Sequence, residues 1–120
     1  MEALLLSAER RGNATVISIR GDLDIVTSPR LDECMAEARH DSHQVILDLA
    51  EVEFMDTSAL AVIVGHWKRL EAGGGTLSLA GARYRYTKTL WITGLADRLP
   101  MYDSVEQALD ALASHSGAES

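Results

Sequence analysis

The residues best suited to chemistry lie in segment 54–60, where the acid Asp56 is followed by two hydroxyls, Thr57 and Ser58. A strand-like apolar run precedes this segment, and a helix-like run, 61–72, follows it. The hydroxyls therefore fall where a helix begins, next to free backbone N–H groups and the positive end of the helix dipole. We expect a phosphate on Ser58 to be accepted there at little structural cost. The pattern predicts a removable surface charge, which is a way to switch binding.

The helix expected over 57–72 is amphipathic, but its outer face is unusually small near the start. The apolar residues predicted to face a sheet are Leu60, Ile63, Trp67 and Leu70. The outer face carries Ser58, Ala61, Val62 and Gly65 before any long charged side chain. A solvated helix usually carries Glu, Lys or Gln in such positions. Two interpretations remain open here: packing against a neighbouring helix, or docking of another protein.

Strand-like and helix-like runs alternate along the chain, which predicts an α/β fold. The predicted strands are 4–8, 14–20, 45–49, 76–81 and 99–102. The predicted helices are one beginning at Ser28-Pro29, then 57–72, 84–92 and one that follows Ser104. We expect a mostly parallel sheet flanked by about four helices, with an antiparallel edge formed by the first two strands.

Short local signals mark the ends of these elements. Gly12-Asn13 is a tight turn, whereas Gly21 to Asp24 should break the second strand. Ser28 is the expected N-cap of the first helix, with Pro29 at its first position. The run 104–107 is a capping box for the last helix.

Length and charge limit the classes of function. The 120 residues predict one domain over 1–114, followed by a flexible polar tail over 115–120. The net charge of −7 argues against direct binding of nucleic acid or of an anionic membrane surface. A single cysteine, Cys34, forms no internal disulfide, and neither a signal peptide nor a membrane span is recognisable. We therefore expect a cytoplasmic protein.

Other chemical sites are weaker interpretations. The glycines of a Gly-x-Ser-x-Gly elbow are missing around Ser58, so an enzyme is not expected. His40 and His43 lack a clear third metal ligand, and no cofactor motif is present. The basic-aromatic run 83–88 suits a nucleic acid or nucleotide, a solvated helix start or the edge of a protein-docking surface, and the overall acidity favours the last two.

The chain resembles the STAS-domain family of bacterial anti-sigma factor antagonists. The segments that carry the resemblance are 21–24, 45–49, 54–60, 73–75 with the strand after it, and 90–95. Each segment is unspecific alone, but their order and spacing together cover residues 4–112. The resemblance implies a STAS-like sheet of the kind described above.

The resemblance also implies a switch. The serine at the position of Ser58 is phosphorylated in that family by an anti-sigma factor with serine kinase activity. The unphosphorylated form binds this partner, the phosphorylated form releases it, and a phosphatase resets the system. Asp24 matches the acidic residue of the family's strand-to-helix loop, so Asp24 and Asp56 should flank Ser58 if the sheet brings that loop close. Two structural interpretations stay open: Asp24 as a turn-former in the run 21–24, and Asp56 as the N-cap of the helix, which is compatible with a role toward a partner. The expected partner-binding residues are Asp24, Asp56, Thr57, Ser58, Ala61, Val62 and Gly65.

Two departures from the family pattern bear on this expectation. Ala59 stands where glycine is common, and its methyl group is expected to crowd a close partner. Thr57 stands where serine is frequent and is a second candidate for phosphorylation, although we expect capping to occupy it. Two alternatives stay open: a STAS scaffold or transporter-associated regulatory domain that is never phosphorylated, and a small-ligand sensor. A monomer or weak homodimer is expected.

Overall fold

Five strands form one mixed sheet in the order β1-β2-β3-β4-β5. The computed structural model describes residues 4–82 and 98–119. The strands are β1 Leu4–Arg11, β2 Ala14–Leu23, β3 Gln44–Met55, β4 Thr76–Ala80 and β5 Met101–Tyr102. β1 and β2 are antiparallel, and every other neighbouring pair is parallel. The predicted mostly parallel sheet with an antiparallel edge is therefore confirmed.

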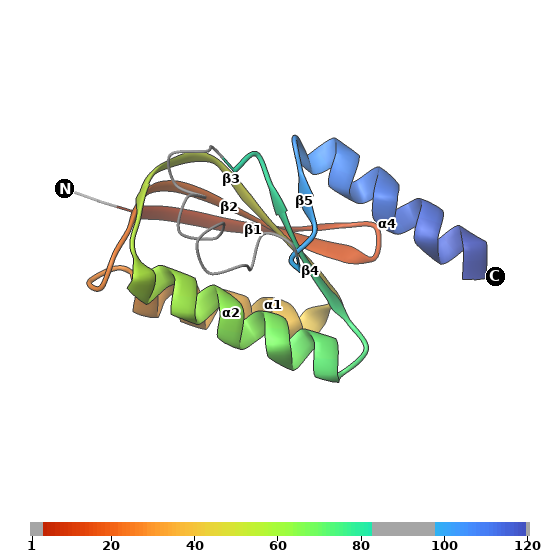
Figure 1. Ribbon diagram of the computed structural model, residues 1–120, viewed down its shortest axis with the longest axis horizontal. Coiled ribbons are helices and arrows are strands. Elements are labelled where there is room, and N and C mark those ends of the chain that lie inside the picture. Colours follow the sequence, from red (N-terminus) through yellow and green to blue (C-terminus); the bar gives the residue numbers. More distant parts are fainter. Residues whose placement is uncertain (1–3, 83–97, 120) are drawn as a thin grey trace.

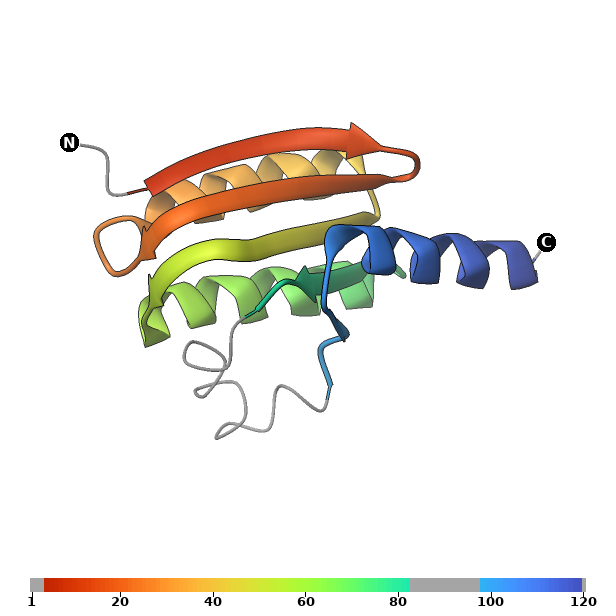
Figure 2. The same cartoon turned by 90° about the horizontal axis from the view of Figure 1, so that it is seen from above.

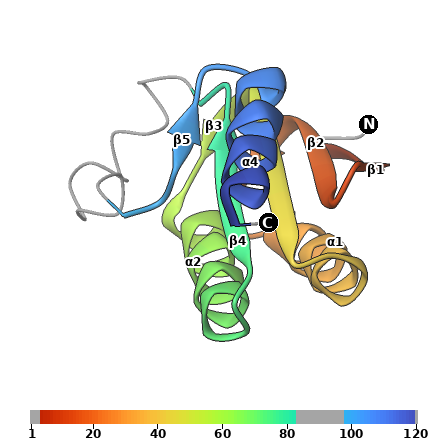
Figure 3. The same ribbon diagram turned by 90° about the vertical axis from the view of Figure 1, so that its right-hand side faces the viewer.

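The helices lie on both faces of the sheet. α1 (Ser28–Asp41) and α2 (Thr57–Ala72) run side by side on one face, while α4 (Val105–Glu119) covers part of the other (Figures 1 and 3). These are the three helices of the described residues, and the helix expected over 84–92 lies outside them. No helix in residues 4–82 or 98–119 combines the length and apolar character that crossing a bilayer requires.

The strands are longer than their local sequence signals predict. The β1–β2 hairpin turns at Gly12, whose φ of 61° suits glycine. The segment 21–24 was expected to end β2 early, which is wrong, because Gly21 pairs with Val52 and Leu23 with Met55. Two register shifts between β2 and β3 each place an extra residue on β3. Such bulges bend a strand and re-aim its last side chains, here those that lead into α2.

Two apolar clusters fill the spaces between layers. The larger lies between the sheet and helices α1 and α2, and the helix residues it buries include Leu31, Met35, Leu60, Ile63, Trp67 and Leu70. The predicted inner stripe of α2 is thereby confirmed. The smaller cluster, under α4, contains Val16, Ile46, Val105, Ala108 and Leu112. Both faces of β3 are therefore covered over its first half, as its continuous apolar run predicts.

The ends of the helices correct three predictions. Thr27, not Ser28, is the N-cap position of α1, and Pro29 lies in the first turn. At α4, Ser104 Oγ accepts the N–H of Gln107 at 3.2 Å, while Gln107 Oε1 accepts the N–H of Asp103 at 3.1 Å, one residue before the capping-box partner. α4 extends to Glu119, into the segment expected to be a tail. The flexibility of that segment stays a prediction.

Candidate partner-binding site at the start of helix α2

The junction between β3 and α2 is fixed from both sides by hydrogen bonds. The N–H of Asp56 donates to the carbonyl oxygen of Leu23 at 3.0 Å, which ties the junction to the end of β2. The carboxylate of Asp56 accepts the N–H groups of Ser58 at 2.9 Å and Ala59 at 3.3 Å. Asp56 is therefore the N-cap of α2, as its residue type predicts.

This cap changes the electrostatics expected for the helix start. The N–H groups of Ser58 and Ala59 were expected to be free for a phosphate, but Asp56 already occupies both. Thr57 was expected to be tied up in capping, which is wrong, since no hydrogen bond of its side chain is found within the described residues. A phosphate on Ser58 would therefore meet a resident carboxylate rather than empty donors.

The three residues after the cap differ in exposure. Thr57 is exposed, Ser58 is half-buried and Ala59 is completely buried in the larger apolar cluster. The Ala59 methyl was expected to crowd a partner, and this expectation is wrong, because the methyl points into the core. The hydroxyl-bearing residues Thr57 and Ser58 both remain at the surface.

The outer face of α2 continues this surface. Ala61 is exposed, and Val62 is half-buried against the core. Gly65 is half-buried, and a Cβ built on it would meet no atom within 4 Å. Packing against a neighbouring helix therefore accounts for part of Val62 but not for Ala61 or Gly65.

The loop between β2 and α1 is held rigidly by Asp24. Its Oδ1 accepts the N–H groups of Val26 and Thr27, each at 3.0 Å, and the Thr27 hydroxyl donates to the carbonyl oxygen of Asp22 at 2.8 Å. The N–H of Thr27, followed by the Thr27 hydroxyl and the N–H of Val26, lowers the pKa of Asp24, against an opposing effect of desolvation. Asp24 therefore has a structural role as a turn-former, the alternative to a purely partner-binding one.

The same loop lies beside the start of α2. Figures 1 and 2 show the loop, the end of β3 and the first turn of α2 at one end of the molecule. The hydrogen bond from Asp56 to Leu23, the residue before Asp24, joins the two segments directly. The sheet thus brings the predicted loop and the predicted hydroxyls to one end of the molecule (Figure 1).

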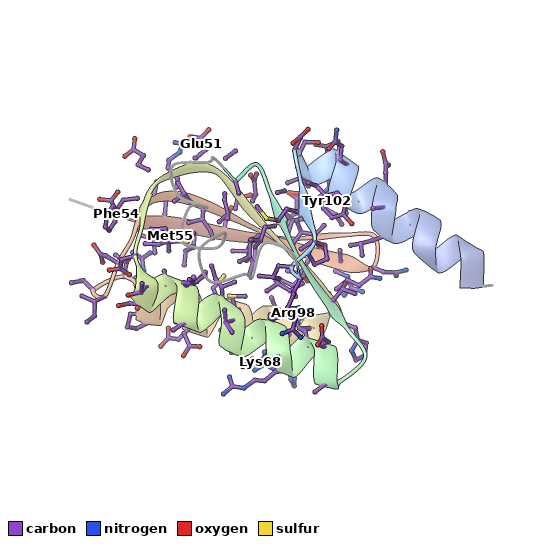
Figure 4. All side chains as sticks on the ribbon, viewed as in Figure 1. Glu51, Phe54, Met55, Lys68, Arg98 and Tyr102 are labelled. Atoms are coloured by element: carbon purple, nitrogen blue, oxygen red, sulfur yellow. The ribbon has the colours of Figure 1, made fainter. Side chains whose placement is uncertain are left out.

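Three exposed apolar residues at this end were missed. Ile25 is 73% exposed, Val26 is 79% exposed and Phe54 is 48% exposed. Figure 4 places Phe54 at the end of the sheet where the β2–α1 loop lies. An Ile-Val pair within a short Asp- and Thr-rich loop was the available sequence signal, since loop positions without a core to face usually carry polar residues.

A polar relay between α1 and α2, centred on the buried His66, was also missed. His66, only 1% exposed, accepts the Arg39 Nε–H on Nδ1 at 2.8 Å, and its Nε2 lies 2.6 Å from Asp32 Oδ1. A guanidinium only donates, so the ring hydrogen belongs to Nε2 and points at Asp32. The spacing of Asp32 and Arg39, seven residues apart on one helix face, was the sequence signal. This relay joins the helices rather than reaching Ser58.

The described residues contain no group of three or more His, Cys, Asp or Glu side chains arranged to hold a metal ion. His40 and His43 are both exposed. The basic-aromatic run 83–88 lies outside the described residues, so its three interpretations stay predictions.

Comparisons with known proteins agree with this geometry. The family model described as "STAS domain" matches residues 6–108. An anti-sigma F factor antagonist of Paenibacillus polymyxa is 30% identical over 111 residues, which is 91% of this chain and 95% of that protein. The chain therefore belongs to the STAS-domain family of anti-sigma factor antagonists.

Solved structures show the same fold. SpoIIAA, described as an anti-sigma factor antagonist in its unphosphorylated form, superposes with a TM-score of 0.80 at 22% identity, covering 92% of this chain and 97% of that one. The Bacillus cell fate determinant SpoIIAA in its phosphorylated form gives a TM-score of 0.74 at 22% identity, covering 90% and 99%.

Proposed function

We propose that this chain is an anti-sigma factor antagonist that binds an anti-sigma factor with serine kinase activity through the start of α2. Phosphorylation of Ser58 by that partner ends the binding, and a phosphatase restores it. The observation that carries the proposal is the position of Ser58, a half-buried residue in the first turn of a helix whose cap is already a carboxylate. SpoIIAA, which shares this fold, exists in an unphosphorylated and a phosphorylated form, and this supports a switch of this kind.

The electrostatics favour a change of binding over a change of fold. A phosphate adds about −1.5 to −2 charges, and the helix dipole offsets only about 0.3–1 kcal/mol of the cost of placing it there. Asp56 accepts the two nearest N–H groups, so the new charge lies beside an existing one. A partner that packs over both groups must complete their desolvation, whereas in the unbound protein both residues keep part of their contact with water.

The remaining predicted residues have distinct roles in this proposal. Ala61 and Gly65 leave room for a partner's backbone, and Val62 adds apolar contact at the edge of the core. Asp24 holds the adjacent loop in place. Binding and release, rather than catalysis, are the activity of this surface, in a cytoplasmic protein that is a monomer or weak homodimer.

Phosphate mapping tests the proposal. The purified protein is incubated with the organism's anti-sigma factor kinases and ATP, and the modified residue is located by mass spectrometry. We expect labelling of wild type and of Thr57→Ala, and none of Ser58→Ala. Labelling that persists in Ser58→Ala and disappears in Thr57→Ala would move the switch to Thr57, and no labelling of either hydroxyl would contradict phosphorylation control.

A further inference from the structure

The described residues contain four large apolar side chains that are strongly exposed, Leu5, Ile25, Val26 and Phe54. We call three of them, Ile25, Val26 and Phe54, the apolar rim. The first two occupy the β2–α1 loop, and Phe54 lies two residues before the cap of α2 (Figure 4). Together they stand at the end of the molecule that carries Ser58.

The loop presents its two apolar residues in a fixed conformation. Leu23 is completely buried on one side of them and Thr27 is 6% exposed on the other. The backbone between these anchors is held by Asp24 Oδ1, and the N–H of Ser28 donates to the Asp24 carbonyl oxygen at 2.8 Å. A surface ordered in advance loses little conformational entropy when it binds, so these side chains can contribute most of their apolar area to affinity.

The segments that carry the rim are acidic, and the two basic residues that flank the loop segment already have partners. Arg20 Nε donates to Glu51 Oε2 at 3.1 Å, and Arg30 Nη1 donates to the Leu4 carbonyl oxygen at 2.9 Å. The two segments that meet at the rim, 21–29 and 52–67, contain four acidic residues and no Lys or Arg. The acidic residues are Asp22, Asp24, Glu53 and Asp56. An apolar centre with an acidic border complements a partner surface that has an apolar hollow with basic side chains around it.

We infer that the apolar rim is the anchor by which the anti-sigma factor kinase is held while it reaches Ser58, with an apolar hollow taking Ile25 and Val26 and basic groups facing Glu53 and Asp56. This inference rests on the proposed function and adds to it the residues that supply affinity. In this inference, the phosphorylation state of Ser58 controls whether the complex dissociates, and the apolar rim supplies most of the affinity of the unphosphorylated form. The hydrogen bond from Asp56 to Leu23 keeps the loop that carries Ile25 and Val26 beside the first turn of α2, so one partner can cover both.

Affinity measurements with the purified kinase and full-length variants test this inference. We expect the double variant Ile25→Ser/Val26→Ser to bind about tenfold more weakly or worse, and Phe54→Ser to show a smaller loss in the same direction. Leu5→Ser is the matched control, because Leu5 is 49% exposed but lies on the edge strand β1, and its affinity should be unchanged. Thermal unfolding confirms that each variant is folded.

A second experiment tests the acidic residues around the rim with Glu53→Lys, since Glu53 is an exposed residue of β3. We expect association to slow several-fold at low salt, with the difference vanishing at high salt. An unchanged Kd for Ile25→Ser/Val26→Ser, or an equal loss of affinity for Leu5→Ser, would contradict the inference that the apolar rim anchors the kinase. Either result would leave the proposed function intact. If wild type binds none of the purified kinases, both the proposed function and the rim are overturned.

Discussion

Asp56 and Leu23, 33 positions apart in the chain, are joined by a backbone hydrogen bond of 3.0 Å from the Asp56 N–H to the Leu23 carbonyl oxygen. This bond places the cap of α2 against the last residue of β2, so the loop that follows β2 lies beside Ser58. The candidate surface is therefore built from two segments that only the parallel pairing of β2 and β3 brings together.

Asp56→Ala removes the N-cap of α2. The N–H groups of Ser58 and Ala59 lose their acceptor, and we expect the free energy of unfolding to fall by about 1 kcal/mol. Urea denaturation measures the change, with Asp110→Ala on the exposed side of α4 as a control that should stay within about 0.5 kcal/mol of wild type. An equally stable Asp56→Ala protein would show that the cap contributes nothing to the helix.

Asp24→Asn should reveal an acid-dependent contribution to stability. The pKa of Asp24 is lowered in the folded protein by hydrogen bonds from Thr27 and Val26. A carboxyl whose folded pKa lies below its unfolded value of 3.8 stabilises the fold above that pH, and the contribution is lost as the pH falls through the folded pKa. Above pH 3.8, the free energy of unfolding of wild type should therefore exceed that of the variant, and this difference should narrow as the pH falls below 3.8. A difference in the free energy of unfolding that stays constant through this range would contradict a lowered pKa of Asp24 in the folded protein.

His66→Ala should destabilise the pairing of α1 with α2. The change leaves Asp32 and Arg39 without their shared partner and opens a cavity, and we expect a loss of about 2 kcal/mol in the free energy of unfolding. His40→Ala, at an exposed position of α1, is the matched control and should cost less than about 0.5 kcal/mol. If His66→Ala lowered the free energy of unfolding no more than His40→Ala does, the relay would contribute nothing to stability.

Substitutions of Gly65 should distinguish effects on stability from effects on partner binding. Because a Cβ at this position meets nothing within 4 Å, Gly65→Ala should fold normally and gain about 0.5–1 kcal/mol from helix propensity. Gly65→Arg should also fold but should weaken binding of the anti-sigma factor about tenfold, since a long side chain then covers the outer face of α2. Unfolding curves and affinities are measured on the same preparations. Full affinity in Gly65→Arg would remove this face from the interface.

The order of elements and the inner faces of the helices follow from the sequence because they depend on local periodicity. Leu60, Ile63 and Trp67 recur at helical spacing, and all three are buried. The extent of the strands does not follow from it, since residues such as Gly21 and Asp22 have weak β propensity and are held by pairing with β3. Tertiary pairing thus overrides the local signal at the end of β2.

The candidate site divides in the same way. Asp56, Ser58 and the capping of the first N–H groups of α2 are recognisable from residue type and position at a helix start, whereas the direction of the Ala59 methyl depends on three-dimensional contacts. The spacing of Asp32 and Arg39 marks two members of the relay, but their meeting with His66 needs the register of α1 against α2, which no local pattern gives. The exposure of Ile25 and Val26 likewise becomes evident only once the core is known.

The most direct test of the central claim is the affinity of one partner for two forms of the same protein. Wild type is phosphorylated by the anti-sigma factor kinase, the phosphate is located at Ser58, and the Kd of each form is measured by calorimetry with Ser58→Ala and Ser58→Glu alongside. We predict that phosphorylation and Ser58→Glu weaken binding, the phosphate by about 100-fold, while Ser58→Ala binds like the unmodified protein. Equal Kd values for the phosphorylated and unmodified forms would contradict the account.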